Sequence, residues 1–430
     1  MSTLITILAW IGGIFGGLIV LIFLSLYIRG AFRDSVIYTV ENPPNLGDPH
    51  SPLVLASLSN SVITHGAITD FWAEPDHIQK ARLKAISQAK KTIHFETFFF
   101  TPGKRADDFA IAIADRAMSG VEVKLLVDSF GAIRMPRNYW KRLKATGVQV
   151  KFFNSFNWKA PANYAGRTHR KLLSIDGEFA LIGGAGISDF WDGLPEIGDT
   201  QPWFDIEFCL EGEIVTVLEG MFIQHWTYSG GIGDLGEHLF DFAEEKDLMI
   251  ATAGSNPTYR FSPIRAITQN TLVSARKSIW IASPYFLPEP NSRQLLINAK
   301  KEGLDVRILT TSVRNDKKWV YYASYEIYGE LLEEGVEIYQ YMPSMIHAKI
   351  LLVDDFWVKT GSANFDPRSF FHNDELDIST SDKTLVYAIK QAFERAFEDS
   401  QKVTLEEWQK RSFWKNRILG NLVSFVQWQL

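Results

Sequence analysis

The sequence has very few of the residues that build disulfides and metal clusters. Cys209 is the one cysteine among 430 residues, so an intramolecular disulfide and a cysteine metal cluster are both excluded. We expect Cys209 to be a small buried apolar residue. None of the nine histidines is followed by a second one four residues later, as in helical zinc motifs. The sequence therefore predicts no metal and no other cofactor.

An excess of basic residues is also missing. The 44 lysines and arginines are outnumbered by 50 aspartates and glutamates, which gives a formal net charge of -6. Proteins that bind nucleic acids usually carry a basic excess, so we expect no nucleic acid as a partner. An anionic substrate would have to be held by local lysine and arginine side chains.

Charge is absent altogether from Leu4 to Ile28. This run exceeds the roughly 20 residues that cross a bilayer as a helix. It has no preceding basic residue and no small-residue cleavage site after it, unlike a signal peptide, so residues 1–33 are predicted to form a transmembrane anchor. Arg29 and Arg33 flank its C-terminal end, which predicts a cytoplasmic body. Overlapping GxxxG pairs make a homodimer through this helix one expectation; they are Gly12, Gly13, Gly16 and Gly17.

The rest of the chain divides into four regions. Residues 34–75 contain a Pro, Gly and Asn run, which indicates a linker or irregular lead-in. Residues 76–247 and 248–400 each alternate helices and short Val/Ile strands in the same order, which predicts a duplicated α/β domain. Residues 401–430 are basic and amphipathic. We expect this last segment either to lie in the membrane interface or to dock on the core.

Each α/β half ends in the same polar motif. The first copy is His169-x-Lys171-x4-Asp176, and the second is His347-x-Lys349-x4-Asp354. Residues i and i+2 of a strand point to one face, so each histidine and its lysine are expected to project into one cavity. A charged side chain on a buried strand is costly unless it is paired or used. Two copies of this costly arrangement predict one pseudo-symmetric site built from both halves.

The two copies differ just after the motif. The second continues with a turn that contains Ser362 and Asn364, whereas the first has Gly184 and Gly186 at these places. We expect the two side chains of the second copy to donate hydrogen bonds to a phosphate. Backbone amides of the glycine turn are the substitute in the first copy. The site is therefore expected to be asymmetric.

These motifs resemble the two HKD motifs of the phospholipase D superfamily. The resemblance covers most of the chain after residue 75. The cluster from Gly361 to Glu375, the N-terminal anchor and the basic aromatic tail are similar to those of bacterial cardiolipin synthases. The resemblance implies two phospholipase D-like α/β halves, an active site at their pseudo-twofold interface and a reaction without a metal.

The resemblance also implies a role for each motif residue. One histidine attacks the substrate phosphorus to form a phosphohistidine, and the other protonates the leaving alcohol and then deprotonates the acceptor hydroxyl. We assign His169 as the nucleophile and His347 as the acid and base, while the near-symmetry of the site leaves the reverse open. Lys171 and Lys349 are expected to bind the non-bridging oxygens.

Four carboxylates complete the expected site. By resemblance, Glu375 holds His347 through its second ring nitrogen, and Asp205 is the candidate for the same task on His169. Asp176 and Asp354 belong to the motifs, and we expect them to be structural anchors near the site more than proton carriers.

The leading hypothesis is a phosphatidyltransferase of the inner cell membrane that makes cardiolipin from phosphatidylglycerol and a second phospholipid. The rivals are a phospholipase D that hydrolyses head groups, and a transferase with another acceptor alcohol. The negative net charge and the predicted transmembrane anchor both argue against a nuclease. A scaffold role would require that the glycine turn of the first half marks a decayed site.

Overall fold

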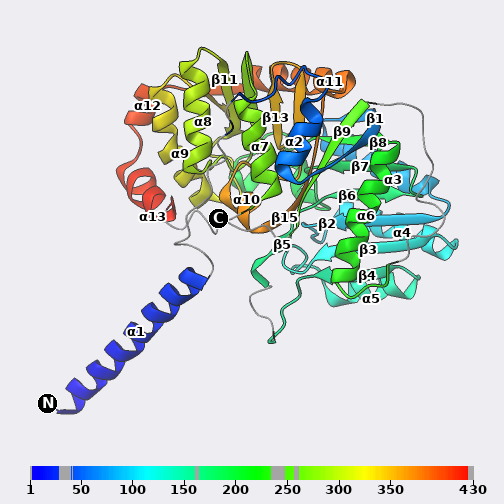
Figure 1. The fold of residues 1–430 in the computed structure, drawn as a ribbon. Coiled ribbons are helices and arrows are strands. Elements are labelled where there is room, and N and C mark those ends of the chain that lie inside the picture. Colours follow the sequence, from blue (N-terminus) through cyan, green and yellow to red (C-terminus); the bar gives the residue numbers. More distant parts are fainter. Residues whose placement is uncertain are drawn as a thin grey trace.

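The chain begins with a long helix that extends away from the body of the protein (Figure 1). The computed structural model describes residues 2–28, 40, 42–159, 164–233, 247–255 and 261–424. Helix α1 spans Ser2–Ile28, and its segment Thr3–Ser25 is the one helix of the described chain that is long and apolar enough to cross a membrane. Arg29 and Arg33, on which the predicted orientation rests, lie outside the described residues.

Two α/β lobes make up the body (Figure 1). The elements of the first are β1 (Val62–Trp72), α3 (Pro75–Gln88), β2 (Thr92–Thr97), α4 (Lys104–Met118), β3 (Glu122–Asp128), α5 (Arg137–Ala145), β4 (Gln149–Phe153), β5 (Arg167–Thr168), β6 (Leu172–Ile175), β7 (Phe179–Gly183), η2 (Asp189–Asp192), η3 (Pro195–Ile197), β8 (Glu207–Glu211) and α6 (Glu213–Tyr228). Each motif histidine and lysine lies directly before a short buried strand, whereas the sequence pattern placed them on the strand itself.

The second lobe repeats this order. Its elements are β9 (Asp247–Gly254), α7 (Pro263–Val273), β10 (Ser278–Ala282), α8 (Pro290–Lys301), β11 (Asp305–Thr311), α9 (Lys318–Glu333), β12 (Glu337–Tyr341), β13 (Ile350–Val353), β14 (Trp357–Gly361), α10 (Pro367–Phe371), β15 (Asn373–Thr380), α11 (Lys383–Glu398) and β16 (Ser400–Val403). The duplicated α/β fold predicted from the sequence is therefore confirmed.

The strands of both lobes form one continuous sheet. Its order along the main path is β16-β12-β11-β10-β13-β14-β15-β9-β1-β8-β7-β6-β2-β3-β4, and β5 pairs with β15 off this path. In each lobe three parallel strands joined by helices are followed by antiparallel strands that carry the motif: β2, β3 and β4 correspond to β10, β11 and β12. The lobes meet where β1 pairs with β9.

The prediction of an irregular lead-in over residues 34–75 is wrong for its second part. Ser51–Ser59 form helix α2, which packs against α7. Val62–Trp72 form β1, which pairs with both β8 and β9. Glycine, histidine and aspartate interrupt the alternation of apolar residues in this strand, so its sequence lacks the usual pattern. The first half thus begins near residue 62, not at residue 76.

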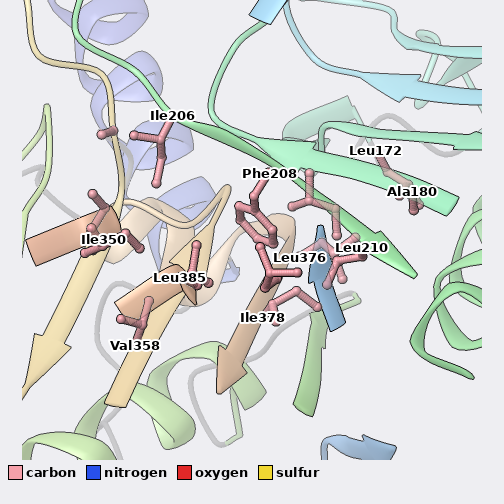
Figure 2. Packing of buried hydrophobic residues seen from close by; sticks show 14 of the residues in the cluster. Leu172, Ala180, Ile206, Phe208, Leu210, Ile350, Val358, Leu376, Ile378 and Leu385 are labelled. Atoms are coloured by element: carbon pink, nitrogen blue, oxygen red, sulfur yellow. The ribbon is translucent and has the colours of Figure 1, made fainter. Parts of the chain in front are cut away.

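A shared hydrophobic core joins the lobes. Figure 2 shows Ile206, Phe208 and Leu210 from β8 and the segment before it, beside residues of β13, β14, β15 and α11. All of these side chains belong to one cluster of buried residues, and Phe208 has no exposed surface. Because apolar burial contributes roughly 25 cal/mol per Å², a core of this kind holds the lobes at a fixed distance. Side chains that each lobe contributes to a common site are therefore held rigidly.

The C-terminal segment docks on the second lobe as far as it is described. It comprises α12 (Leu405–Gln409), the π-helix η4 (Phe413–Gly420) and α13 (Asn421–Ser424). Gly420 lies close to the backbone of α9, and Arg411 forms an ion pair with Glu326 of that helix. Phe413 and Trp414 stay exposed. Residues 425–430 of the predicted amphipathic segment lie outside the described residues.

Candidate active site

The two motif segments approach each other through backbone pairing between the lobes. Strand β5, which leads into His169, pairs in parallel with the start of β15, and the amide of His169 donates to Asp374 O at 2.8 Å. In the pseudo-symmetric position, Ile346 bridges to Phe204, and the amide of His347 donates to Phe204 O at 2.6 Å. Each histidine is thus anchored next to a strand of the opposite lobe.

The backbone pairing of each histidine segment with the opposite lobe determines which carboxylate contacts which histidine. His169 Nδ1 lies 3.0 Å from Glu375 Oε2, and His347 Nδ1 lies 2.9 Å from Asp205 Oδ2. The sequence assignment, in which Glu375 holds His347 and Asp205 holds His169, is therefore wrong. Asp205 and Glu375 directly follow the residues that pair with the incoming histidine segment, so each reaches the histidine of the other lobe. Because the carboxylate engages Nδ1, the Nε2 atom of each ring is the one that remains for chemistry.

The two lysines are close enough for their charges to interact. Lys171 Nζ donates to His169 O at 2.6 Å, and Lys349 Nζ lies 2.8 Å from Nδ1 of His347 and 3.2 Å from its Nε2. Burial lowers the pKa of Lys349 to about 8, and burial together with the charge of Lys349 lowers the pKa of Lys171 well below its usual range. Two cations at close quarters with little water form a strong site for an anion.

Both imidazoles are held in the neutral form. Burial is the largest cause, followed by the lysine charges, and together they lower the pKa of His347 to about 3 and that of His169 well below its usual range. Each histidine interacts electrostatically with both lysines, so the four side chains share one site. A neutral imidazole is a nucleophile, and an anionic ligand would counter the lysines and raise its pKa.

Aromatic rings enclose the histidines. The ring of Phe98 lies 5.3 Å from His169, and the rings of Trp191 and Trp203 lie 5.1 Å and 5.8 Å from His347. His169 and His347 are accordingly only 9% and 8% exposed. A phosphate in this place would be largely shielded from bulk water.

Asp176 and Asp354 lie away from this site. Each follows its strand, so it is separated from its lysine by five residues, or roughly 16 Å of extended chain. Asp176 accepts the backbone amides of Lys90, Lys91 and Thr92 at 2.7–2.8 Å. Asp354 accepts three amides at the start of β10 in the same way. They are structural anchors, as expected, but placing them among the catalytic residues and near the site is wrong.

Ser362 and Asn364 are placed differently from one another. The Ser362 hydroxyl bonds to Glu375 and accepts the amide of Leu376 at 2.9 Å, so it supports the carboxylate and is not free for a phosphate. Its prediction as a phosphate donor is therefore wrong. Asn364 Oδ1 is buried with no hydrogen-bond partner among the described residues. The role of Asn364 toward phosphate stays a prediction.

The glycine turn of the first half is a steric requirement. A Cβ added to Gly184 would lie 2.2 Å from Asp205 Oδ1, and one added to Gly186 would lie 2.6 Å from Phe99 O and 3.2 Å from the Trp191 ring. Gly184 thus leaves room for the Asp205 carboxylate, and Gly186 leaves room for Phe99 and the Trp191 ring. Trp191 Nε1 donates to Asp205 Oδ2 at 2.9 Å. The first half therefore supports its carboxylate with an indole where the second half uses hydroxyl groups.

Two supporting residues were missed by the sequence reasoning. Trp191 and Ser369 both stand 22 residues after their histidines. Ser369 Oγ donates to Glu375 Oε1 at 2.7 Å, in the role that Trp191 plays for Asp205. Their equal spacing from the motifs is the signal that identifies them, although unlike residue types conceal it.

A buried polar network lies behind the first motif. His225 Nδ1 bonds to Glu96 Oε1 at 2.7 Å, and its Nε2 lies 3.2 Å from Asp374 Oδ2. Glu96 also accepts the hydroxyl of Thr168, the residue before His169. The network supports the segment that carries His169 and does not contact its ring. Within the described ranges, no group of three or more His, Cys, Asp or Glu residues is arranged to hold a metal ion.

Comparisons with known proteins agree with this geometry. The family model described as "Cardiolipin synthase, PLD-like domain" matches residues 83–189 and 269–397, which include both motifs. The chain is 33% identical to cardiolipin synthase 2 of Bacillus cereus over 344 residues, which cover 78% of this chain and 66% of that protein, just under two thirds. It is 31% identical to cardiolipin synthase 1 of the same species over 410 residues, which cover 92% of this chain and 78% of that protein.

A solved structure has the same fold. The phosphatidylserine synthase of Haemophilus influenzae Rd KW20 matches with a TM-score of 0.69 at 13% sequence identity, over 88% of this chain and 100% of that one. At this identity the match concerns the fold alone, and the family follows from the sequence matches. The chain belongs to the phospholipase D superfamily, in the family of cardiolipin synthase PLD-like domains.

Proposed function

We propose that this membrane-anchored protein is a phosphatidyltransferase that makes cardiolipin from phosphatidylglycerol and a second phospholipid, through a phosphohistidine. The observation that carries the proposal is the pair of buried imidazoles, each held at Nδ1 by a carboxylate of the other lobe and both facing two lysines. This arrangement supplies a nucleophile, a proton carrier and two ammonium groups that can bind one phosphodiester.

The reaction has two balanced steps. In the first, the bound phosphodiester offsets the lysine charges, so that His347 carries a proton on Nε2. Nε2 of His169 attacks phosphorus, the bond from phosphorus to the glycerol oxygen breaks, and His347 gives that proton to the oxygen. In the second, His347 takes the proton of the acceptor hydroxyl, whose oxygen attacks phosphorus and breaks the bond to His169. Lys171 and Lys349 hold the non-bridging oxygens throughout.

The environments of the carboxylates support this assignment of roles. Asp205 is buried, but its contacts with His347 hold its pKa at about 2, so it stays anionic and stabilises a protonated His347. Burial raises the pKa of Glu375, whose oxygens also accept hydrogen bonds from Ser362, Ser369 and Asn373. A weaker anion beside His169 favours the neutral imidazole that a nucleophile needs.

Transfer is favoured over hydrolysis because the site is enclosed. Burial of both histidines and the rings of Phe98, Trp191 and Trp203 limit the access of water to a phosphohistidine. The second substrate would then be a lipid hydroxyl. We also propose that α1 is a single-pass anchor in the inner cell membrane and that the body lies in the cytoplasm, on the basis of Arg29 and Arg33.

The test is an assay of the purified full-length protein in vesicles that contain phosphatidylglycerol, with separation of the lipid products. We expect cardiolipin and free glycerol in equal amounts, and neither product from the His347→Ala variant. Phosphatidic acid without cardiolipin would instead identify a hydrolase. Unchanged turnover by His347→Ala would contradict the mechanism.

A further inference from the structure

Two loops at the rim of the first lobe expose large apolar side chains beside the active site. The loop after β3 carries Phe130 and Ile133, which are 52% and 67% exposed, and the loop after β4 carries Phe156 and Trp158, which are 50% and 86% exposed. Tryptophan is usually well buried in folded proteins, so this degree of exposure is unusual. We call these four residues the rim cluster.

The rim cluster is attached to the catalytic machinery. Arg167, two residues before His169, donates to Ser129 Oγ at 3.2 Å in one loop and to Asn154 O at 3.2 Å in the other. The first loop also packs on Phe98, whose ring contacts His169, since a Cβ on Gly131 would collide with Phe98 O. The apolar residues therefore stand at the edge of the site that holds the nucleophile.

The charge of these loops differs from that of the whole chain. The two loops and the first turn of α5 that follows the first loop, residues 129–138 and 155–159, contain Arg134, Arg137 and Lys159, all exposed, and no acidic residue. The chain as a whole has a net charge of -6. Exposed aromatic residues next to basic ones are the combination that binds the interface of an anionic bilayer, where tryptophan rings sit among the head groups.

We propose that the rim cluster inserts into the membrane interface and sets the active site against the bilayer surface. The occupant is a lipid surface and not a second protein, because α1 already tethers the chain to a membrane and the loops carry a basic charge that complements anionic lipids. The tether fixes only that the body is near the bilayer, whereas the rim cluster fixes which face meets it. A lipid head group then reaches His169 without leaving the membrane.

The single cysteine allows a direct test. Cys209 is buried, and burial raises the pKa of its thiol to about 11, so it resists labelling. The variants Trp158→Cys and Ile133→Cys each take one environment-sensitive fluorophore in the full-length protein. A matched control is Tyr387→Cys, at a position about as exposed as Ile133. It belongs to α11, a helix that Figure 1 shows at the upper edge of the body, while β4 and β5 lie toward the lower edge.

The labelled proteins are reconstituted in vesicles of phosphatidylcholine and phosphatidylserine, so that insertion is measured without phosphatidylglycerol and independently of the proposed reaction. We expect a blue shift for the labels at positions 158 and 133, and quenching by lipids with a spin label on the acyl chain, with neither effect at position 387. Equal signals at the rim and the control would overturn the proposal. So would a blue shift without lipid quenching, which indicates a contact with protein.

A second measurement concerns activity. The double variant Phe156→Ala, Trp158→Ala should raise the KM for lipid in vesicles severalfold and leave kcat on a soluble short-chain phosphatidylglycerol unchanged, because these residues position the membrane and do not touch the reacting atoms. An equal loss on both substrates would indicate a structural defect and contradict the proposal.

Discussion

The two lobes share one backbone plan and support the site with different chemistry. In the second lobe the carboxylate of Glu375 accepts hydrogen bonds from the hydroxyls of Ser362 and Ser369. In the first lobe the carboxylate of Asp205 accepts a hydrogen bond from the indole of Trp191; Gly184 leaves space for the carboxylate and Gly186 for the indole. A duplicated frame thus holds two similar histidines in unlike surroundings. In the proposed reaction, this difference lets one histidine act as nucleophile and the other carry protons.

Removing either histidine should have the largest effect on activity. Both His169→Ala and His347→Ala are expected to lower the rate of cardiolipin formation by at least about 10⁴-fold, because groups that act as a unit fail together. The measurement is initial rates in vesicles, with circular dichroism to verify folding. If one variant kept substantial activity, the two lobes would not share one reaction.

Neutralising the carboxylate of each lobe should lower kcat to a different extent. Asp205→Asn is expected to lower kcat roughly 10²- to 10³-fold, because it removes the anion that stabilises protonated His347. Glu375→Gln should cost less, since the raised pKa of Glu375 makes it the weaker anion. Steady-state kinetics of the two isosteric variants make the comparison, and equal losses would contradict unequal roles.

The supporting donors Trp191 and Ser369 should give smaller and separable effects. Trp191→Phe and Ser369→Ala each remove one hydrogen bond to a carboxylate, which is worth about 1.5–3 kcal/mol when the acceptor is charged, or roughly 10- to 100-fold in kcat/KM. Gly184→Ser should abolish activity, since its side chain would collide with Asp205. Ser362→Gly, the reverse exchange in the other lobe, fits sterically and should lower kcat/KM only about as much as Ser369→Ala, since it too removes one hydrogen bond to Glu375.

The pH dependence of substrate affinity should report on Lys349. Its pKa is lowered to about 8, so its charge is present below that pH and is lost as the pH rises through it. The KM for phosphatidylglycerol is therefore expected to rise above pH 8. Lys349→Arg keeps its charge at all accessible pH values, so its KM should stay flat over this range. A rise in KM for the arginine variant as well would assign the titration to another group.

The motif aspartates should affect stability more than chemistry. Asp176→Ala leaves three backbone amides without their acceptor and is expected to lower the free energy of unfolding by about 1–3 kcal/mol. The kcat of the folded fraction should be nearly unchanged. Thermal unfolding followed by kinetics below the transition tests this, and a loss of kcat without a loss of stability would return Asp176 to the catalytic set.

The sequence predicts the duplicated fold and the histidine and lysine pairs because these depend on local spacing and on short buried strands. It does not predict which carboxylate meets which histidine, because that pairing depends on contacts such as Thr168 with Asp374, more than 200 residues apart. Strand β1 was missed because its burial comes from neighbours in both lobes and not from its own pattern. The role of Ser362 was misjudged because its partner is buried beside it in the fold.

In the proposed reaction one histidine of the pair is covalently modified while the other moves protons. The most direct measurement is to trap the intermediate with phosphatidylglycerol labelled in the phosphatidyl group, digest the protein and identify the modified peptide. We expect label on His169 in the wild type, none in His169→Ala, and little or none in His347→Ala, because that variant lacks the proton donor of the first step. Label on His347, or product formed without any covalent intermediate, would contradict it.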